Sequence, residues 1–177
     1  MCGILGIFGF EFDKTVESLH LQNHRGPDNT GIWEENGVFL GHKRLSILDL
    51  NIRSNQPFQL GNEIIIFNGE IYNYRELAKQ HDLDLITTSD TEVVLLMYQK
   101  YKEKCLDYFN GMFSFIIFNV VNKKYFVARD RLGIKPLYWH HSSKFKDIFS
   151  SEVSSIKNLI PTTIDPFSIR QYKKLRM

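Results

Sequence analysis

Hydrophobic residues in this chain gather in short runs that end at glycine, asparagine or charged residues. Runs rich in β-branched and aromatic residues, with turn residues between them, are typical of β-strands. The pattern predicts strands at residues 4–10, 31–35, 38–45, 62–69, 112–121, 124–130, 135–141 and 147–151. The runs on either side of Asn122 and Lys123 are expected to form a hairpin, because only a short polar connection separates them.

Other segments place hydrophobic residues at helical spacing. Residues 90–104 have the strongest such pattern, and Asp90 or Thr91 is suited to cap the amino-terminal end. A helix over residues 74–80 is expected to have Asn73 as its N-cap. Further helices are predicted at residues 14–21, 151–160 and 166–175.

The order of these elements indicates the fold class. Several strands are apolar along nearly their whole length, which indicates that both of their faces are covered. Strands and helices do not alternate regularly along the chain, so a parallel doubly wound sheet is not expected. We therefore predict an α+β fold in which mainly antiparallel sheets are sandwiched by helices.

The composition fits one globular domain. The 177 residues are 43% hydrophobic and 24% charged, which suits a chain with a large core. A formal net charge of +2 predicts neither a nucleic-acid-binding surface nor a membrane-surface patch. The longest apolar run, MFSFIIFNVV, is about half as long as a membrane span, and the first run is a poor signal peptide because glycines interrupt it. We therefore expect a soluble, cytoplasmic protein.

Few residues are suited to metal or phosphate binding. The two cysteines, Cys2 and Cys105, are too few for a disulfide framework or a complete zinc site. The histidines show no metal-ligand spacing with carboxylates or thiols, and no glycine-rich phosphate loop is present. No metal and no cofactor are expected for this domain. Cys105 is interpreted as a half-buried structural thiol.

Cys2 is separated from a free amino terminus by a single cleavage. A thiol is a good nucleophile, but its ordinary pKa of about 8.5 leaves only a few per cent as thiolate at neutral pH. An α-amino group with a pKa of about 8 could act as base, and removal of Met1 would create one on Cys2 itself. The alternative is a cysteine that stands here by chance, which residue type alone does not exclude.

Asn68 and Gly69 follow an apolar strand. The amide of Asn68 and the N–H of Gly69 could both donate to an oxyanion, since glycine permits close approach. The alternative is a tight hairpin turn, for which Asn-Gly is a strong signal. The segment that follows has a helical pattern rather than that of a matching strand, which weakens the hairpin interpretation.

Two charged residues could recognise the ends of a free amino acid. Arg44 could bind a carboxylate bidentately, and Asp90 could bind an ammonium group. Each has a simpler interpretation, Arg44 as a surface cation and Asp90 as a helix cap. The turn-rich segments HRGPDNTG and ARDRLGIKPLYW are interpreted as structural loops, with Asp28 stabilising the first.

Together these segments resemble the amino-terminal glutaminase domain of the glutamine-hydrolysing asparagine synthetases, a class II glutamine amidotransferase domain of the N-terminal-nucleophile hydrolase superfamily. The matching segments stand in the order MCGI, HRGPDNTG, GHKRLSILDL, NQPF, FNGEIYNYREL, TSDTEV, FNGMFSF and RDRLGIKPLYW. HRGPD and RDRLGIKPLY favour this branch over the related domains of glucosamine-phosphate synthase and the phosphoribosyl-pyrophosphate amidotransferase.

The resemblance implies a four-layer αββα fold and a catalytic role for Cys2. After removal of Met1, Cys2 would attack the side-chain amide of L-glutamine, with its own α-amino group as base. Asn68 and Gly69 would stabilise the oxyanion, and water would release glutamate from the thioester.

The resemblance also assigns the substrate-binding residues. Arg44 would bind the α-carboxylate of glutamine, and Asp90 would help to place its α-amino group. The implied binding set is Arg44, Leu45, Ser46, Ile47, Leu48, Asn68, Gly69, Glu70 and Asp90.

The resemblance implies a larger parent protein. Residues 1–160 would form the amidotransferase domain, and residues 161–177 would begin a linker or helix leading to a synthetase domain. That domain would use ATP and magnesium and receive ammonia through a tunnel, and a homodimer is also considered. The acceptor could be aspartate, a sugar acid or another carboxylate. A non-catalytic glutamine-binding domain is the alternative if Met1 is retained.

Overall fold

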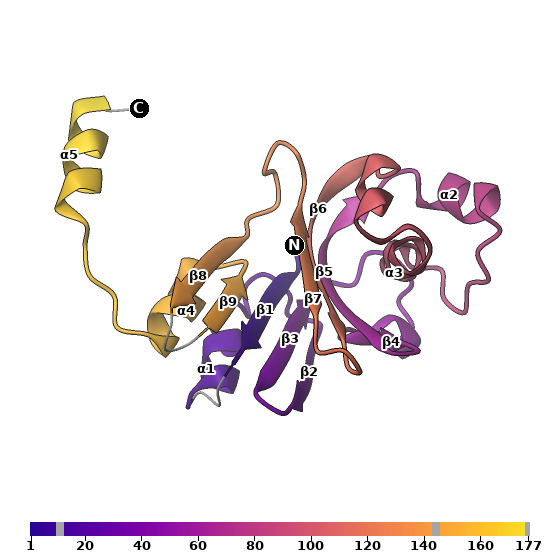
Figure 1. Cartoon of the computed structure of the whole chain (residues 1–177), viewed down its shortest axis with the longest axis horizontal. Helices are drawn as coiled ribbons and strands as arrows, with labels where there is room; N and C mark the ends of the chain where they lie inside the picture. Colours follow the sequence, from indigo (N-terminus) through magenta and orange to yellow (C-terminus); the bar gives the residue numbers. More distant parts are fainter. Residues whose placement is uncertain (10–12, 143–145, 176–177) are drawn as a thin grey trace.

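The computed structural model describes residues 1–9, 13–142 and 146–175, and it contains two antiparallel sheets (Figure 1). The first has the strand order β2-β3-β1-β9-β8, and the second β4-β5-β6-β7. The strands of the first sheet are β1 (Gly3–Phe8), β2 (Asn29–Glu35), β3 (Val38–Arg44), β8 (Tyr138–Ser142) and β9 (Lys146–Ser150). Those of the second are β4 (Phe58–Leu60), β5 (Glu63–Ile71), β6 (Gly111–Asn119) and β7 (Tyr125–Arg129).

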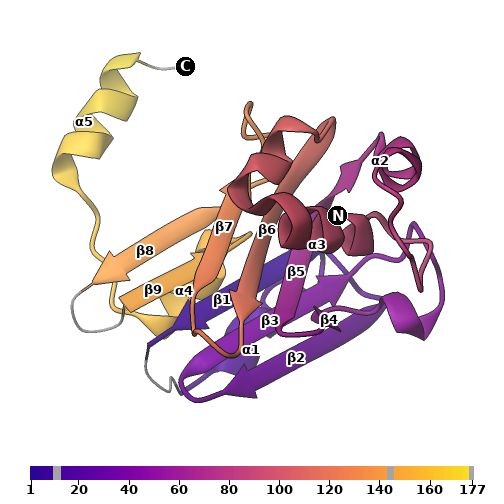
Figure 2. The ribbon, with the colours of Figure 1, turned by 45° about the vertical axis from the view of Figure 1, so that its right-hand side comes forward.

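Helices cover the outer face of each sheet. The described α-helices are α1 (Thr15–His20), α2 (Tyr74–Gln80), α3 (Asp90–Tyr101), α4 (Val153–Leu159) and α5 (Pro166–Leu175), and 3-10 turns occupy η1 (Ile52–Ser54) and η2 (Lys102–Asp107). Figures 1 and 2 show α1 and α4 beside the first sheet, and α2 and α3 beside the second. Within the described residues, no helix is long and apolar enough to cross a membrane.

Three hydrophobic clusters show the order of the layers. One lies between the sheets and includes Ile4, Phe8, Ile64, Ile66 and Ile116. A second packs the other face of the first sheet against α1 and α4, and a third packs the other face of the second sheet against α2 and α3. Both faces of each sheet are therefore covered, which confirms the predicted α+β fold and its four-layer αββα arrangement.

The sequence pattern located most elements correctly. The expected hairpin is confirmed, because β6 and β7 pair antiparallel. The helix predicted over residues 90–104 ends earlier, at Tyr101, since Lys102 has a left-handed φ of 53° and a 3-10 turn follows. The short strand β4 was not predicted, and the end of the first predicted strand, Phe10, lies outside the described residues.

The capping prediction is correct in position only at α2 and is wrong at α3. Asn73 makes no side-chain cap bond at α2; its side chain instead donates to the carbonyl oxygen of Tyr108 and accepts from the N–H of Asn110. At α3 the cap is Ser89, whose hydroxyl accepts from the N–H of Thr91. Ser89 therefore satisfies the amino-terminal end of α3, whereas Asn73 occupies the N-cap position of α2 but directs its side chain to other partners.

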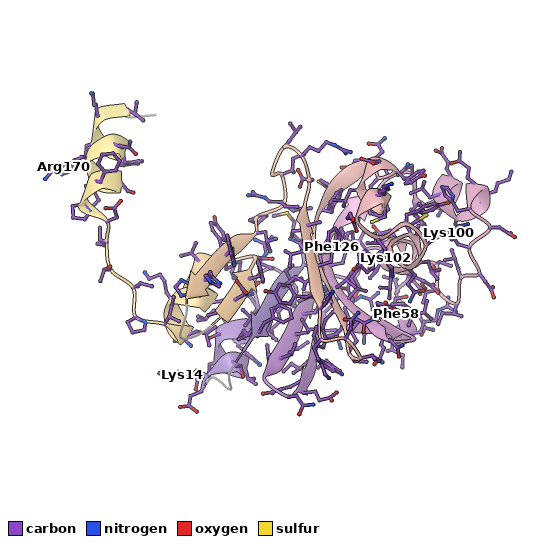
Figure 3. All side chains as sticks on the ribbon, in the orientation of Figure 1. Lys14, Phe58, Lys100, Lys102, Phe126 and Arg170 are labelled. Atoms are coloured by element: carbon purple, nitrogen blue, oxygen red, sulfur yellow. The ribbon has the colours of Figure 1, made fainter. Side chains whose placement is uncertain are left out.

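The carboxy-terminal segment differs from the body of the chain. Residues 161–175 are exposed throughout, and α5 has no buried residue. Figure 3 shows α5, with Arg170 labelled, apart from the two sheets. The boundary expected at residue 160 stays a prediction.

Candidate active site

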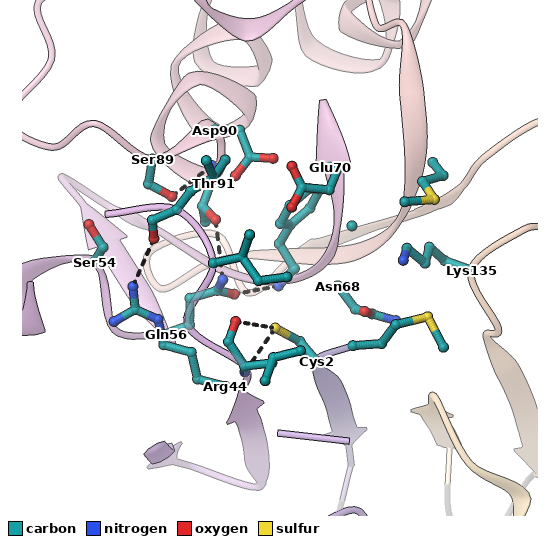
Figure 4. Close-up of a pocket in the computed structure, with 17 residues that line it drawn as sticks. Cys2, Arg44, Ser54, Gln56, Asn68, Glu70, Ser89, Asp90, Thr91 and Lys135 are labelled. Carbon is teal, nitrogen blue, oxygen red and sulfur yellow. Dashed lines mark hydrogen bonds between the residues drawn. The ribbon is translucent and has the colours of Figure 1, made fainter. Parts of the chain in front are cut away.

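The period of two along a β-strand directs Cys2 and Asn68 to the same layer. Cys2 is two residues before Ile4, which packs between the sheets, and alternate residues of a strand share a face. Asn68 is likewise in phase with Ile64 and Ile66 on β5. The start of the first sheet's central strand and the end of β5 therefore present these side chains at one edge of the inter-sheet core (Figure 4).

A pocket of about 200 Å³ lies at this edge. Its lining comprises Met1, Cys2, Arg44, Leu45, Ile47, Leu48, Ser54, Gln56, Phe67, Asn68, Gly69, Glu70, Ser89, Asp90, Thr91, Met112 and Lys135. All the site residues expected from the sequence are in this set except Ser46. The backbone N–H of Ser46 donates to the carboxylate of Asp28 at 2.7 Å, so Asp28 fixes the loop after β3.

The Cys2 side chain is held against the loop that follows β3. Its Sγ lies 3.4 Å from the N–H of Leu45, which donates to it, and 3.7 Å from the Leu45 carbonyl oxygen. On the backbone side, Nε of Arg25 donates to the Cys2 carbonyl oxygen at 2.9 Å. Burial raises the pKa of the Cys2 thiol above its ordinary value, although the Leu45 N–H and the Arg44 cation oppose that rise. The thiol is therefore positioned but needs help to ionise.

Asn68 and Gly69 lie inside β5 and not in a turn, so the hairpin interpretation is wrong. Asn68 is 1% exposed, and neither its amide nitrogen nor its amide oxygen has a hydrogen-bond partner among the described residues. A buried amide without partners costs free energy, which a ligand could recover. Gly69 faces β6 so closely that a side chain would collide with the carbonyl oxygen of Met112.

Arg44 is buried, so its interpretation as a surface cation is wrong. Its two Nη atoms donate to acceptors in the following loop, among them the carbonyl oxygens of Leu48 and Asn51 at 3.2 Å each. No carboxylate pairs with it in the described part of the chain. The arginine therefore shapes the pocket wall over residues 45–51 and leaves an uncompensated positive charge there.

Asp90 is the first residue of α3 and is also buried. Its carboxylate accepts a hydrogen bond from the N–H of Ile71 at 2.9 Å, and the N-cap of α3 is the preceding residue, Ser89. Burial raises the pKa of Asp90 to about 7, the Ile71 bond opposes this rise, and nearby Glu70 adds to it. A cationic group in the pocket would stabilise the ionised carboxylate.

Sequence reasoning missed several lining residues, including Ser54 and Thr91. Gln56 connects two elements of the site: its Oε1 accepts from the N–H of Phe67 at 2.6 Å, and its Nε2 donates to the Thr91 hydroxyl at 3.2 Å. Gln56 has no sequence signal beyond its place in NQPF, one of the segments that carry the resemblance. Lys135 belongs to the loop interpreted as purely structural, and the structure places it in the pocket wall.

Two other titratable residues lie away from the pocket lining. His42 is buried between the sheets with Nε2 3.1 Å from the Phe67 carbonyl oxygen, and burial lowers its pKa to about 3, so it is neutral. Cys105 is fully buried rather than half-buried, in the cluster beneath the second sheet. Among the residues described, no group of three or more His, Cys, Asp or Glu side chains could hold a metal ion.

An αββα sandwich with a thiol at the start of its first strand has the layout of the N-terminal-nucleophile hydrolases. The sequence profile of the glutamine amidotransferase domain matches residues 1–177. The chain therefore belongs to the glutamine amidotransferase domain family.

Curated relatives agree with this assignment. The chain is 35% identical to asparagine synthetase B (glutamine-hydrolysing) of Escherichia coli over 97% of its own length and 32% of the relative. It is 36% identical to asparagine synthetase 3 of Bacillus subtilis over 88% of its length and 27% of the relative. It is 40% identical to asparagine synthetase 1 of the same organism over 78% of its length and 24% of the relative. The chain thus spans about a third or less of these relatives.

Proposed function

We propose that this domain hydrolyses L-glutamine to L-glutamate and ammonia through a thioester on Cys2. One observation carries the proposal: the buried, unpartnered amide of Asn68 lines the same pocket as the Cys2 thiol. An acyl-transfer reaction needs a nucleophile and hydrogen-bond donors for the oxygen that becomes negatively charged. The pocket contains both, the Cys2 thiol as nucleophile and the Asn68 amide as donor.

The reaction would proceed in two steps, formation of the thioester and its hydrolysis. The thiol proton passes to the α-amino group of Cys2, Sγ bonds to the amide carbon, and the carbonyl oxygen becomes an oxyanion held by Asn68 and the Gly69 N–H. The carbon–nitrogen bond then breaks, and the nitrogen leaves as ammonia with the transferred proton. Water attacks the thioester, releasing glutamate and restoring the thiol. Met1 is 55% exposed and so is accessible for the removal that frees the α-amino group.

The charged residues of the pocket would hold the two ends of the amino acid. The uncompensated cation of Arg44 suits the α-carboxylate, and the buried carboxyl of Asp90, with Glu70, suits the α-ammonium group. Leu45 to Leu48 would form the wall beside them, with Ser46 acting through its backbone. This arrangement fixes the side-chain amide at the Cys2 end.

The parent activity would be transfer of the ammonia to an acceptor. The relatives are named as glutamine-hydrolysing asparagine synthetases and are about three times as long as the matched region or more. A synthetase part that uses ATP and magnesium to activate aspartate or another carboxylate would follow this domain, which itself would need no cofactor.

Replacing the nucleophile tests the proposal. Cys2→Ala is expected to lower glutamate release from glutamine by at least about 1,000-fold, because the thioester no longer forms. Glutamate and ammonia are measured separately, and intact mass confirms that Met1 is absent. Cys105→Ala, the other cysteine of the chain, serves as the matched control and should retain activity. Full activity in Cys2→Ala, or glutamine binding without any release of ammonia by the wild type, would contradict the proposal.

A further inference from the structure

Lys135 is a buried lysine whose ammonium group has no partner among the residues that the structure describes. The residue is 4% exposed, yet its Nζ makes no hydrogen bond or ion pair with any residue that the structure describes. Lysine is almost never this buried unless it is paired. Figure 4 shows the side chain entering the pocket from the side opposite Ser54 and Ser89 and extending toward Asn68. The charge therefore lies at the reactive end of the pocket.

The loop that carries Lys135 is fixed on both sides of the residue. The carboxylate of Asp130 accepts from the backbone N–H of Ile134 at 2.8 Å and of Lys135 at 2.9 Å. Nε of Arg129 donates to the Lys135 carbonyl oxygen at 2.7 Å. Gly133 has a φ of 64°, which a residue with a side chain adopts only with strain. These contacts hold the backbone that directs the ammonium group into the pocket.

Lys43 is a second buried lysine, and its contacts are those of a residue with a structural role. Lys43 is 2% exposed, and its Nζ donates to the hydroxyl of Thr30 at 2.6 Å on the neighbouring strand. It does not line the pocket. Within the described ranges Lys135 has no such acceptor, so its charge is available to groups in the pocket.

Negative charge would form at Cys2, and burial opposes it. Around Lys135 the charged groups are Arg25, Glu70 and Asp130. Around Cys2 they are Arg44, Asp90 and the terminal amino group. Arg44 shares its donors with several loop oxygens. Burial, with the nearby Arg25 cation, lowers the pKa of Lys135, whereas Cys2, Glu70 and Asp130 favour its charged form. An ammonium cation and a thiolate in one low-dielectric pocket stabilise each other.

We propose that the Lys135 ammonium group is the electrostatic partner of the Cys2 thiolate, stabilising the negative charge that forms on Sγ. Where the proposed glutaminase activity holds, the same charge stabilises the oxyanion that Sγ creates. The proton on Lys135 stays in place, so the α-amino group remains the base.

Alkylation of Cys2 by iodoacetamide tests this proposal without glutamine. Sγ bonds to the methylene carbon, iodide leaves, and the thiol proton goes to solvent, so the rate follows the thiolate fraction. In the processed protein, Lys135→Met is expected to alkylate about tenfold more slowly than wild type at pH 7, which corresponds to a rise of about one unit in the thiol pKa. The two rates should converge at high pH, where both thiols are ionised. Intact-mass and peptide analysis separate Cys2 from Cys105.

Controls distinguish an electrostatic role from a structural one. Lys43→Met removes the other buried ammonium group and should leave the pH profile unchanged, and Lys135→Arg should restore most of the wild-type profile. An unchanged profile in folded Lys135→Met, or an equal shift in Lys43→Met, would overturn the proposal. A variant that slows alkylation equally at every pH would also overturn it, because access rather than ionisation would then have changed.

A measurement on unaltered Lys135 covers the case in which its neutral variants do not fold. The ¹³Cε resonance of Lys135 should follow the ionisation of Cys2 as the pH rises, and that step should vanish in Cys2→Ala. Absence of the step in wild type contradicts the lysine proposal. Loss of glutamine hydrolysis is read separately, so either proposal can fail while the other stands.

Discussion

Asp90 and Asp130 are two buried carboxyl groups whose pKa values shift in opposite directions. Asp130 accepts from three backbone N–H groups, those of Phe113, Ile134 and Lys135. Burial alone would raise its pKa, but these hydrogen bonds lower it below the ordinary value. The carboxylate of Asp90 accepts from the N–H of Ile71, and burial raises its pKa to about 7.

The difference separates a carboxylate that stabilises the loop of the site from one that is available to pair with a cationic ligand. The charge of Asp130 is already stabilised by the backbone, so it fixes a loop. The charge of Asp90 is poorly stabilised by the protein, so a cationic ligand can supply what is missing. The same reasoning distinguishes the unpartnered amide of Asn68 from a buried amide with a structural role.

The largest expected effect concerns Asp130. Asp130→Asn should lower the free energy of unfolding by about 3 kcal/mol, because an amide nitrogen would face backbone N–H groups and bonds to a charged acceptor would be lost. Urea denaturation at pH 7.5 measures this. The deficit should shrink as the pH falls through the lowered pKa of Asp130, where the wild-type carboxylate also loses its charge. Equal stability of the two proteins would show that the loop does not depend on this carboxylate.

The matched substitution at Asp90 should affect substrate instead of the fold. Asp90→Asn is expected to raise the KM for glutamine about 50-fold, since an uncharged amide no longer compensates the α-ammonium group. Its unfolding free energy should not fall, because the substitution removes a poorly stabilised buried charge. Steady-state kinetics and urea denaturation on the same sample test both parts. A loss of stability similar to that of Asp130→Asn would remove the distinction between the two carboxyl groups.

The fold was accessible from the sequence because its strands are covered on both faces. Continuous apolar runs such as β5 and β6 reveal this condition directly, and it requires helices outside each sheet. The missed strand β4 has only three residues, too few to show a period. The wrong cap at α3 and the missing cap bond at α2 arose because local patterns do not show which neighbouring hydroxyl or carbonyl competes for a polar side chain.

The site was accessible in part. Cys2 and Asn68 could be placed on one layer from the strand period, once the sheets were expected to stack. The direction of Lys135 could not be read, because its position depends on Asp130 and Arg129, which act through backbone contacts in an irregular loop. Loop geometry of this kind is set by tertiary hydrogen bonds and leaves no periodic signal.

The smallest expected effect is a pH dependence of glutamine binding. With a pKa of about 7, Asp90 is mostly protonated at pH 6 and mostly ionised at pH 8. The α-ammonium group prefers the ionised carboxylate, so below pH 7 binding requires loss of a proton, and the Kd should be about tenfold higher at pH 6 than at pH 8. Calorimetry on Cys2→Ala isolates binding from thiol chemistry.

The control for this pH dependence is the double variant that also carries Asp90→Asn, in which the Kd should be weak and nearly independent of pH. A similar pH dependence in that variant would assign the titration to another group of the pocket. A dependence of opposite sign would mean that the neutral form of Asp90 binds the substrate. The contrast between Asp90 and Asp130 would then rest only on their different effects on the free energy of unfolding.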